Sequence, residues 1–378
     1  MKIKYILTHP IQYQVPMIKF LIKNNINLTV LYRSDLNTKT HFDEGFKKKI
    51  TWKTNLLKGY KYRFLNHFGT NKIGTILPLT TDFYRGILDK STDIIWIHNL
   101  KIWYNLLIII FAKILKKKVF ARDEVHKFSK ERNLFNNLFN KIFYKLINPF
   151  IDIFLAIGSM NRKYYLENNV PKKKIILMPY VVDNKLFAPK KKITKNKRIQ
   201  ILFAGKLIKR KGIDILLKAI TILNNKKNLK NKFDLTIVGD GVLKNSIQNY
   251  IKKGNLKNIK LLSFKNELEL SNLYQKSDIF IMPSYHEPWG LTVNEALASK
   301  NAIVCSDKVG SSYDLVKNGQ NGYLFKEKDF KDLAAKIFKL INDRKKIEKY
   351  KIKSLKIISN WSFKQCLDGL RQAVVRIS

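Results

Sequence analysis

The stretch SDIFIMPSYHEPWGLTVNEAL, residues 277–297, decides the fold predicted for this chain. Its apolar start, residues 279–282, has the length of a buried strand, and Gly290 opens a predicted helix. Glu287 lies in the loop between them, and Glu295 follows eight residues later, about one turn into the helix. A strand that passes through a loop directly into a helix is the repeating unit of a parallel α/β sheet.

The same loop and helix start have the chemistry of a sugar-nucleotide site. Carboxylates accept hydrogen bonds from sugar hydroxyl groups, and the backbone N–H groups near Gly290, Leu291 and Thr292 would meet phosphate at the positive end of the helix. A capped surface helix with solvated acids is the alternative explanation. Because Trp289 beside a glycine is unusual in such a surface segment, we favour the binding site.

Two further motifs follow predicted strands in this half of the chain. In ILFAGKLIKRKGIDILL, residues 201–217, Gly205 makes a turn, and Lys206 and Lys211 flank the start of a helix, where two cations would neutralise a diphosphate without a metal ion. The alternative is a plain strand-turn-helix connection with solvated lysines. The turn at Gly239 is a Gly-x-Gly without the third glycine of a dinucleotide fingerprint, so a plain tight turn is the favoured explanation and nicotinamide binding has little support.

Alternation of apolar strands and helices extends along the whole chain and predicts two domains. In the first half we expect strands at 2–7, 28–32, 94–97, 118–121 and 153–157, with helices at 16–23 and 134–146. In the second half we expect strands at 199–204, 234–238, 259–262 and 279–282, with helices from Ile213 and Val242. The Lys-rich stretch APKKKITKNKR, residues 188–198, suits an exposed linker. We therefore predict domains at 1–190 and 191–360, followed by a C-terminal helix at 361–378.

Composition narrows the possible partners. The chain has 378 residues, 45% of them hydrophobic, and a formal charge of +45 that comes mostly from lysines spread along its length. No zinc-finger spacing, basic region with heptads or ribonucleoprotein signature occurs, so we do not expect nucleic acid as a partner. Diffuse lysine charge is compatible with an anionic inner-leaflet surface.

One apolar run and the two cysteines bear on location. The run WYNLLIIIFAKIL, residues 103–115, is shorter than the roughly 20 apolar residues that span a bilayer. It is either a buried helix between two strands or a helix lying on a membrane with lysines below it. Cys305 and Cys366 exclude a disulfide framework and favour a reducing compartment, and residues 1–14 lack the pattern of a signal peptide. We expect a cytoplasmic protein, with peripheral contact to the inner face of the membrane left open.

Taken together, these motifs resemble glycosyltransferase family 4. The resemblance rests on Glu287 and Glu295 with the preceding Pro-Ser pair, on Gly205-Lys206-Leu, and on Lys211-Gly212. It covers about residues 155–325 and implies the GT-B fold, in which two Rossmann-like domains face each other across a cleft. It also implies retention of anomeric configuration and a nucleoside-diphosphate-sugar donor, with the acceptor on the first domain. The C-terminal helix would return to that domain.

The resemblance assigns roles to individual residues. Lys206 and Lys211 would hold the donor diphosphate, with Gly205 and Gly239 in the adjoining loops. Glu287 would contact sugar hydroxyls beside the anomeric carbon, Glu295 would contact the ribose, and His98 matches a strand-end histidine that faces the reacting centre. Weaker candidates for acceptor contacts also end predicted strands: His9, Arg122, Asp123 and His126.

Three positions depart from the family pattern. HPIQY, residues 9–13, stands where a glycine-rich loop is usual, Lys300 replaces a usual glycine, and Asp314 replaces a frequent glutamate. No clustered Asp-x-Asp motif is present, so we expect no metal and no cofactor besides the donor. The acceptor is expected to be a saccharide or a lipid-linked saccharide, as in bacterial surface polysaccharide or lipopolysaccharide synthesis. Two alternatives remain: a GT-B nucleotide-sugar epimerase, and a basic protein without enzymatic activity that binds membranes or nucleic acid.

Overall fold

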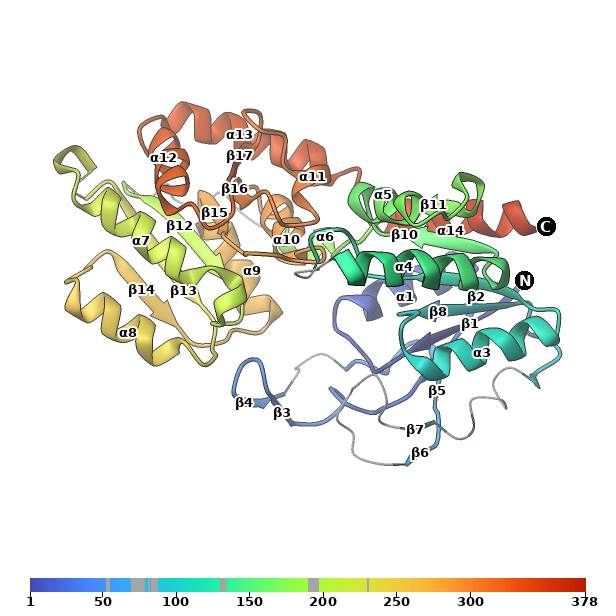
Figure 1. Ribbon diagram of the computed structural model, residues 1–378. Coiled ribbons are helices and arrows are strands. Elements are labelled where there is room, and N and C mark those ends of the chain that lie inside the picture. The colour runs from blue at the N-terminus through green and yellow to red at the C-terminus, as the bar shows by residue number, and fades with distance from the viewer. Residues whose placement is uncertain are drawn as a thin grey trace.

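The chain folds into two α/β lobes that lie side by side (Figure 1). This computed structural model describes residues 1–51, 55–68, 79–80, 82, 88–129, 134–189, 197–229 and 231–378. Most of the predicted linker, residues 190–196, lies outside the described residues. Each lobe is built on one parallel sheet, and we refer to the lobes as the first and second domains.

The first domain has a seven-stranded sheet with the order β11-β10-β9-β8-β1-β2-β5. Its strands are β1 (Lys2–Leu7), β2 (Asn27–Tyr32), β5 (Lys61–Phe64), β8 (Ile94–His98), β9 (Lys118–Arg122), β10 (Ile153–Ala156) and β11 (Ile175–Leu177). Both faces of the sheet are buried: Tyr5 points into one core and Ile6 into the other. This two-sided burial explains why the strands are continuous apolar runs.

The second domain has a six-stranded sheet with the order β14-β13-β12-β15-β16-β17. Its strands are β12 (Ile199–Ala204), β13 (Phe233–Val238), β14 (Ile259–Leu262), β15 (Ile279–Met282), β16 (Ala302–Ser306) and β17 (Gly322–Phe325). The strands expected from the sequence in both halves coincide with these within one residue at each end.

Helices cover both faces of each sheet (Figure 1). They are α1 (Gln14–Lys23), α3 (Trp103–Ile114), α4 (Leu134–Ile147), α5 (Ser159–Glu167), α6 (Asn184–Phe187), α7 (Ile213–Asn224), α8 (Lys244–Lys253), α9 (Glu267–Lys276), α10 (Leu291–Ala298), α11 (Ser312–Leu315), α12 (Phe330–Ile341), α13 (Arg344–Ile358) and α14 (Phe363–Ile377). Helix α14 packs against α1, β10 and β11 of the first domain, although it follows the second domain in sequence.

Two expectations about helices need correction. Helix α8 begins at Lys244 and not at Val242, because residues 241–243 form a turn after β13. Helix α3 lies between β8 and β9 as expected, yet it is buried on one side only, and Ile110 and Ile114 on its other side are exposed.

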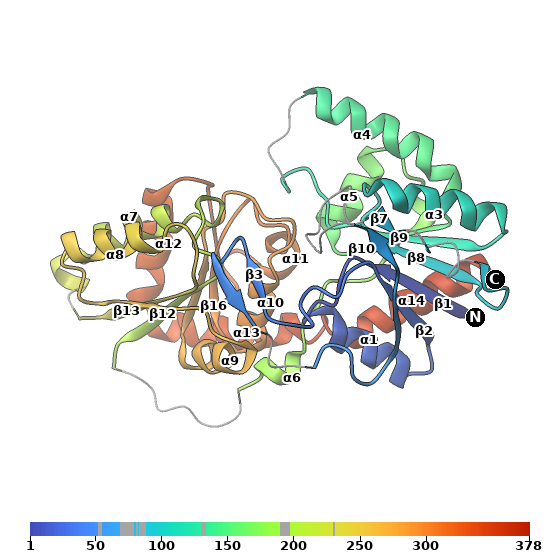
Figure 2. The same cartoon turned by 90° about the horizontal axis from the view of Figure 1, so that it is seen from below.

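A short antiparallel hairpin leaves the first sheet after β2. It consists of β3 (His41–Asp43) and β4 (Lys48–Ile50), and we refer to residues 41–50 as the hairpin. Seen from below, the hairpin extends away from the seven-stranded sheet and lies against the second domain (Figure 2). Strands β6 (His67–Phe68) and β7 (Leu79–Thr80) pair in a second small antiparallel sheet.

Candidate functional site

Strand order determines where each domain can hold a ligand. In the second sheet the order reverses between β12 and β15, so the loops after these two strands diverge and leave a crevice at their carboxyl ends. Those loops contain Gly205 to Lys211 and Pro283 to Gly290. In the first sheet the corresponding reversal lies between β1 and β8, where His9 and His98 follow or end the strands. Several of the predicted residues therefore lie in loops or at strand ends beside the two crevices.

Glycines let the two loops of the second domain pack tightly. Gly212 has a φ of +66°, and a Cβ atom there would lie 2.0 Å from the carbonyl oxygen of Pro283. Gly290 has a φ of +94° and precedes α10, where a Cβ atom would lie 2.8 Å from Met282. A larger residue at either position would strain the backbone and collide with its neighbour. Glycine therefore allows the first turns of α7 and α10 to lie close to the crevice.

Glu287 is held by two cations. Its Oε2 atom accepts hydrogen bonds from Lys211 Nζ at 2.6 Å and from Arg210 Nη1 at 2.7 Å. Burial alone would raise the pKa of Glu287, but the charges of Lys211 and Arg210 hold the pKa below its usual value. The carboxyl group is therefore ionised at neutral pH. Arg210 was not selected from the sequence, although it lies in the same stretch, residues 201–217, as Lys206 and Lys211. Its position next to Lys211 is the signal that could have identified it.

Glu295 has a different environment. Tyr274 donates its hydroxyl hydrogen to Glu295 Oε2 at 2.9 Å, and burial raises the pKa of the carboxyl group to about 7. Located one turn into α10, it lines the pocket and is placed to accept hydrogen bonds from a ligand's hydroxyl groups.

A pocket of about 810 Å³ lies between the two domains. Gly205, Lys206 and Gly239 line it from the loops after β12 and β13, and Leu291, Thr292 and Glu295 line it from α10. The first domain contributes the loop after β1, with His9 and Tyr13, then Leu36 and Asn37, and residues 41–46 of the hairpin. Lys211, Glu287, Gly290 and His98 are outside the set of residues that line this pocket.

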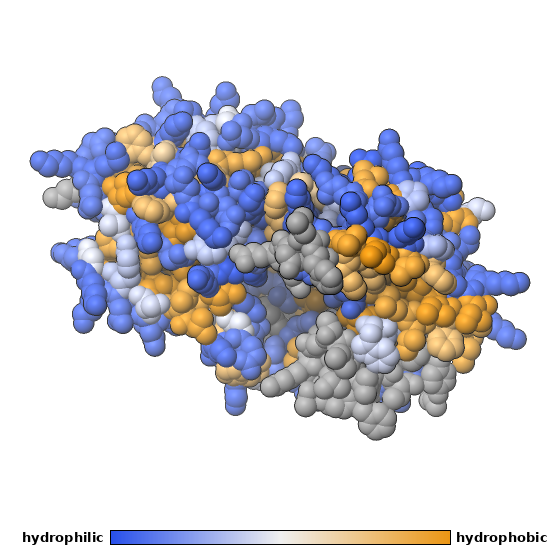
Figure 3. Space-filling model, in the orientation of Figure 1, coloured by the Kyte–Doolittle hydropathy of each residue, from blue (hydrophilic) through white to orange (hydrophobic). Residues whose placement is uncertain are grey.

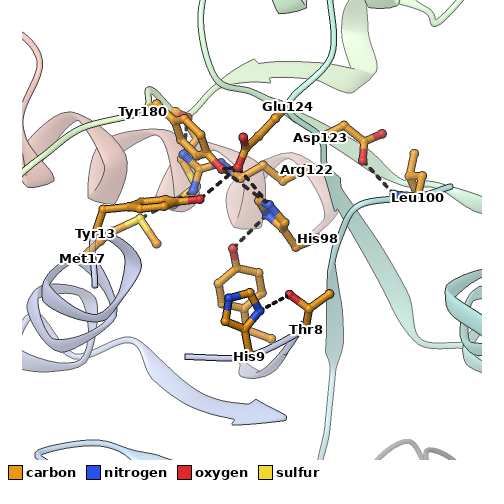
Figure 4. A network of polar contacts seen from close by, with 12 residues as sticks. Thr8, His9, Tyr13, Met17, His98, Leu100, Arg122, Asp123, Glu124 and Tyr180 are labelled. Atoms are coloured by element: carbon orange, nitrogen blue, oxygen red, sulfur yellow. Dashed lines mark hydrogen bonds and ion pairs between the residues drawn. The ribbon is translucent and has the colours of Figure 1, made fainter. Parts of the chain in front are cut away.

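His98 belongs to a network of aromatic and acidic side chains in the first domain (Figure 4). Its Nδ1 atom lies 3.3 Å from the Tyr5 hydroxyl group, and its Nε2 atom lies 3.5 Å from Glu124 Oε1. Tyr13 and Tyr180 also donate hydrogen bonds to Glu124. Glu124 was not predicted from the sequence, because the residues that it contacts, Tyr13, His98 and Tyr180, are far apart in the chain.

The other two histidines expected to face an acceptor, His9 and His126, differ in position. His9 lines the pocket, and burial lowers its pKa to about 4, so its ring is neutral at neutral pH. His126 is 1% exposed and joins the domains: its Nδ1 atom accepts from Phe128 N–H at 3.1 Å, so Nε2 carries the hydrogen and donates to the Glu287 carbonyl oxygen at 2.9 Å. His126 thus supports the Glu287 loop.

Arg122 and Asp123 do not face the pocket, and this corrects their expected orientation toward an acceptor. Arg122 is 1% exposed and donates to the carbonyl oxygens of Met178 and Pro179 at 3.0 and 3.1 Å. Asp123 is 2% exposed and accepts from Leu100 N–H at 2.7 Å. Arg122 ends β9 and Asp123 directly follows it, but the polar groups of both join main-chain segments inside the first domain.

Among the described residues, no group of three or more His, Cys, Asp or Glu side chains is arranged to hold a metal ion. Over the same part of the chain, no helix is both long and apolar enough to cross a membrane.

Comparisons with known proteins find a family match in the second half of the chain. Residues 184–356 match the family model of glycosyl transferases group 1. An uncharacterized glycosyltransferase of Methanocaldococcus jannaschii is 29% identical over 177 residues, which is 47% of this chain and 48% of that protein. The capsular polysaccharide biosynthesis glycosyltransferase CapM of Staphylococcus aureus is 26% identical over 204 residues, 51% of this chain and 52% of that protein. The chain thus spans about half the length of these curated relatives.

The solved structures extend the similarity to the whole chain at the level of the fold. HepE of Anabaena, in complex with UDP, superposes with a TM-score of 0.76 at 16% identity, covering 99% of this chain and 100% of HepE. This confirms the fold class predicted from the sequence. The protein has the GT-B fold of two Rossmann-like domains, and its residues 184–356 are similar to the glycosyl transferases group 1.

Proposed function

We propose that this protein is a retaining, metal-independent glycosyltransferase of the family 4 type. It would move a sugar, of the hexosyl class, from a nucleoside-diphosphate sugar to a saccharide or lipid-linked acceptor. The observation that carries the proposal is the pocket between the domains, where Lys206, the start of α10 and Glu295 converge at the crevice of the second sheet. UDP bound to HepE, and the role of CapM in capsular polysaccharide synthesis, agree with this donor and acceptor class.

Each part of the donor has a candidate partner. The ammonium group of Lys206 and the N–H groups at the start of α10 would neutralise the diphosphate, with Lys211 adding charge if it exchanges Glu287 for phosphate. Glu295 would accept hydrogen bonds from the ribose hydroxyl groups. Glu287 would meet sugar hydroxyl groups beside the anomeric carbon, opposite His98 of the first domain.

The reaction would break the bond between the anomeric carbon and the diphosphate oxygen and form a new glycosidic bond on the same face. The acceptor hydroxyl would lose its proton to the leaving diphosphate, so no protein base is required. Lys206 and Lys211 would stabilise the charge that develops on the leaving group. Closure of the domains would exclude water from the reacting centre.

A donor panel tests this proposal. UDP-, GDP- and dTDP-sugars are added with and without EDTA, and both thermal stabilisation and release of nucleoside diphosphate in the presence of saccharide and lipid-linked acceptors are measured. We expect one nucleotide class to stabilise the protein without metal. We expect Glu287→Gln to lose transfer by at least about 100-fold, as for loss of one transition-state contact, and Glu348→Gln on α13 to keep it.

The alternatives predict other results. An epimerase would convert the donor sugar without any acceptor. A non-enzymatic basic protein would release no nucleoside diphosphate, and its binding to nucleic acid would weaken steeply with salt. The configuration of the product, measured by NMR, decides retention: an inverted product would contradict the same-face route.

We also propose that the first domain binds an anionic membrane through an apolar surface on α3 and α4. Large apolar side chains on both helices are exposed: Ile110, Phe111 and Ile114 on α3, and Leu138, Phe139, Ile142 and Leu146 on α4. They form a continuous hydrophobic area in the space-filling view (Figure 3). A large apolar area that is exposed to solvent marks an interaction site.

Charge favours lipid over protein as the partner at this apolar surface. Helices α3 and α4 contain no acidic residue, and exposed lysines lie on or beside them: Lys141 and Lys145 on α4, and Lys116 two residues after α3. Each lysine near an anionic bilayer contributes about 1 kcal/mol to binding. A second copy of the chain, with the same charge of +45, would be repelled. An apolar face with a cationic border therefore matches an anionic bilayer.

Vesicle flotation tests the membrane proposal. We expect wild type to float with phosphatidylcholine–phosphatidylglycerol vesicles and not with pure phosphatidylcholine. The double variant Phe139→Ser/Ile142→Ser should lose flotation, whereas Val375→Ser, which alters an even more exposed apolar residue on α14, should not. Gel filtration of the same variants is the second measurement. A wild-type dimer that the double variant dissociates would identify the surface as a subunit interface and overturn the proposal.

A further inference from the structure

The hairpin places a carboxylate on the lysine proposed to bind the donor. Asp43 Oδ1 and Oδ2 lie 2.8 and 3.1 Å from Lys206 Nζ, although the two residues are 163 positions apart. A Cβ atom built on Gly45 would lie 2.6 Å from the same ammonium nitrogen, so the turn of the hairpin packs directly on the lysine. The cation of the donor pocket is therefore neutralised from the first domain.

Two further contacts hold the hairpin in this position. Lys48 Nζ lies 2.9 Å from Asp240 Oδ2 at the end of β13. The ring of Phe46 packs edge-on against Phe264, with centroids 5.0 Å apart, and Lys206 Nζ lies 4.7 Å from the Phe46 centroid. Ionic and aromatic contacts thus connect the hairpin to the loops after β12, β13 and β14.

Asp43 is oriented by its own turn. Its Oδ1 atom accepts hydrogen bonds from the N–H groups of Gly45 and Phe46 at 2.8 and 2.9 Å. The carboxylate is therefore fixed before it meets Lys206, and it lines the pocket that a nucleotide would enter. The two lysines proposed to bind the diphosphate have different carboxylate partners: Lys211 pairs with Glu287, and Lys206 pairs with Asp43.

We propose that Asp43 is a built-in counter-ion of the donor pocket, which a nucleoside diphosphate must displace from Lys206 to bind. The inference rests on the proposed function, because it assumes that Lys206 holds the diphosphate. An anionic ligand cannot share the ammonium group with Asp43 without placing like charges within a few ångströms, which disfavours binding. Displacement would also detach the turn of the hairpin from Lys206. The Lys48–Asp240 ion pair and the Phe46–Phe264 ring contact would remain. Binding of the donor would thereby change a contact between the two domains, and so affect the first domain, on which the acceptor is proposed to bind.

Asp43→Asn tests this competition with little change in shape. The asparagine keeps an oxygen that accepts from Gly45 and Phe46 N–H, but it has no charge to offer Lys206. Isothermal titration with UDP, GDP and dTDP should show roughly tenfold tighter binding to Asp43→Asn than to wild type, because an ion pair is removed from the free state and a repulsion from the bound state. Asp35→Asn is the matched control: Asp35 precedes the hairpin, is not among the residues that line the pocket, and pairs with Lys39 at 3.6 Å. It should bind within about twofold of wild type.

Lys206→Gln separates this inference from the proposed function. If wild type binds a nucleotide, Lys206→Gln does not, and Asp43→Asn binds no tighter than wild type, the competition is refuted and the donor site stands. Weaker binding to Asp43→Asn would instead make Asp43 a ligand contact and equally overturn the inference. If no variant binds any of the three nucleotides, the donor site itself is wrong, and the inference fails with it.

Discussion

Glu295 shows how burial of one carboxyl group makes stability depend on pH. Burial raises the pKa of the carboxyl group in the folded protein to about 7, from 4.5 in the unfolded chain. Between these values the folded state holds the proton more tightly, so the free energy of unfolding falls as pH rises through this window. The group is expected to cost about 3 kcal/mol once pH exceeds its folded pKa.

Urea unfolding of wild type and Glu295→Gln, between about pH 5 and about pH 8, measures this cost. The variant should lose that part of the pH dependence and gain stability relative to wild type as pH rises. Tyr274→Phe is the second variant: it removes the hydrogen bond to Glu295 that lowers the pKa, so its stability should go on falling to higher pH than that of wild type. A wild-type minus Glu295→Gln difference that is flat with pH would show that the carboxyl group has an ordinary pKa.

At the residue scale, the sequence could predict groups that belong to one continuous motif. Glu287, Glu295 and Lys206 each follow a strongly apolar strand, and the turn residues around them indicate a ligand-binding loop. Asp43 and Glu124 could not be predicted, since their roles come from contacts between distant segments. For Arg122 and Asp123 the strand end was predicted, but the direction of each side chain depends on packing that the sequence alone does not show.

At the scale of elements, strand-helix units were predictable and the hairpin was not. The parallel strands are apolar on both faces and stand out from their flanks. Strands β3 and β4 are three residues each, HFD and KKI, and are mostly polar. Their position comes from contacts with the second domain, which a local sequence pattern cannot reveal.

Gly212 packs on the loop after β15 at the candidate site, and its replacement tests how closely the two loops must pack. Gly212 and Gly319 have similar φ angles, +66° and +77°, but a Cβ atom at Gly212 meets the Pro283 carbonyl oxygen at 2.0 Å, whereas at Gly319 nothing lies within 4 Å. Alanine at Gly319 should cost about 1 kcal/mol, the price of a left-handed conformation.

Alanine at Gly212 should cost a further ~2 kcal/mol or more, because the loop that carries Glu287 must move. Thermal unfolding of the two variants, compared with wild type, gives the difference. Equal destabilisation by both replacements would mean that the loops after β12 and β15 can separate without cost, and would weaken the argument that their packing positions Glu287.

At the scale of the whole molecule, the C-terminal helix ties the end of the chain to the first domain. Leu370 on α14 is fully buried in the core that contains Tyr5 and Trp96, whereas Val375 on the same helix is 76% exposed. Trp361, just before the helix, stacks on Trp289 of the Glu287 loop with ring centroids 5.4 Å apart. The last residues therefore contact both domains.

This arrangement predicts that damage to the chain's end is felt at its beginning. Leu370→Ala should destabilise the first domain by about 2–5 kcal/mol, as for other large-to-small replacements in a core, and Val375→Ala should have little effect. Hydrogen exchange measured by mass spectrometry locates the effect: exchange in Leu370→Ala should accelerate in β1, β10 and β11, which pack near α14, and stay unchanged in β12 to β17. Faster exchange confined to α12 and α13 would contradict this, because it would mean that α14 is energetically part of the second domain that precedes it.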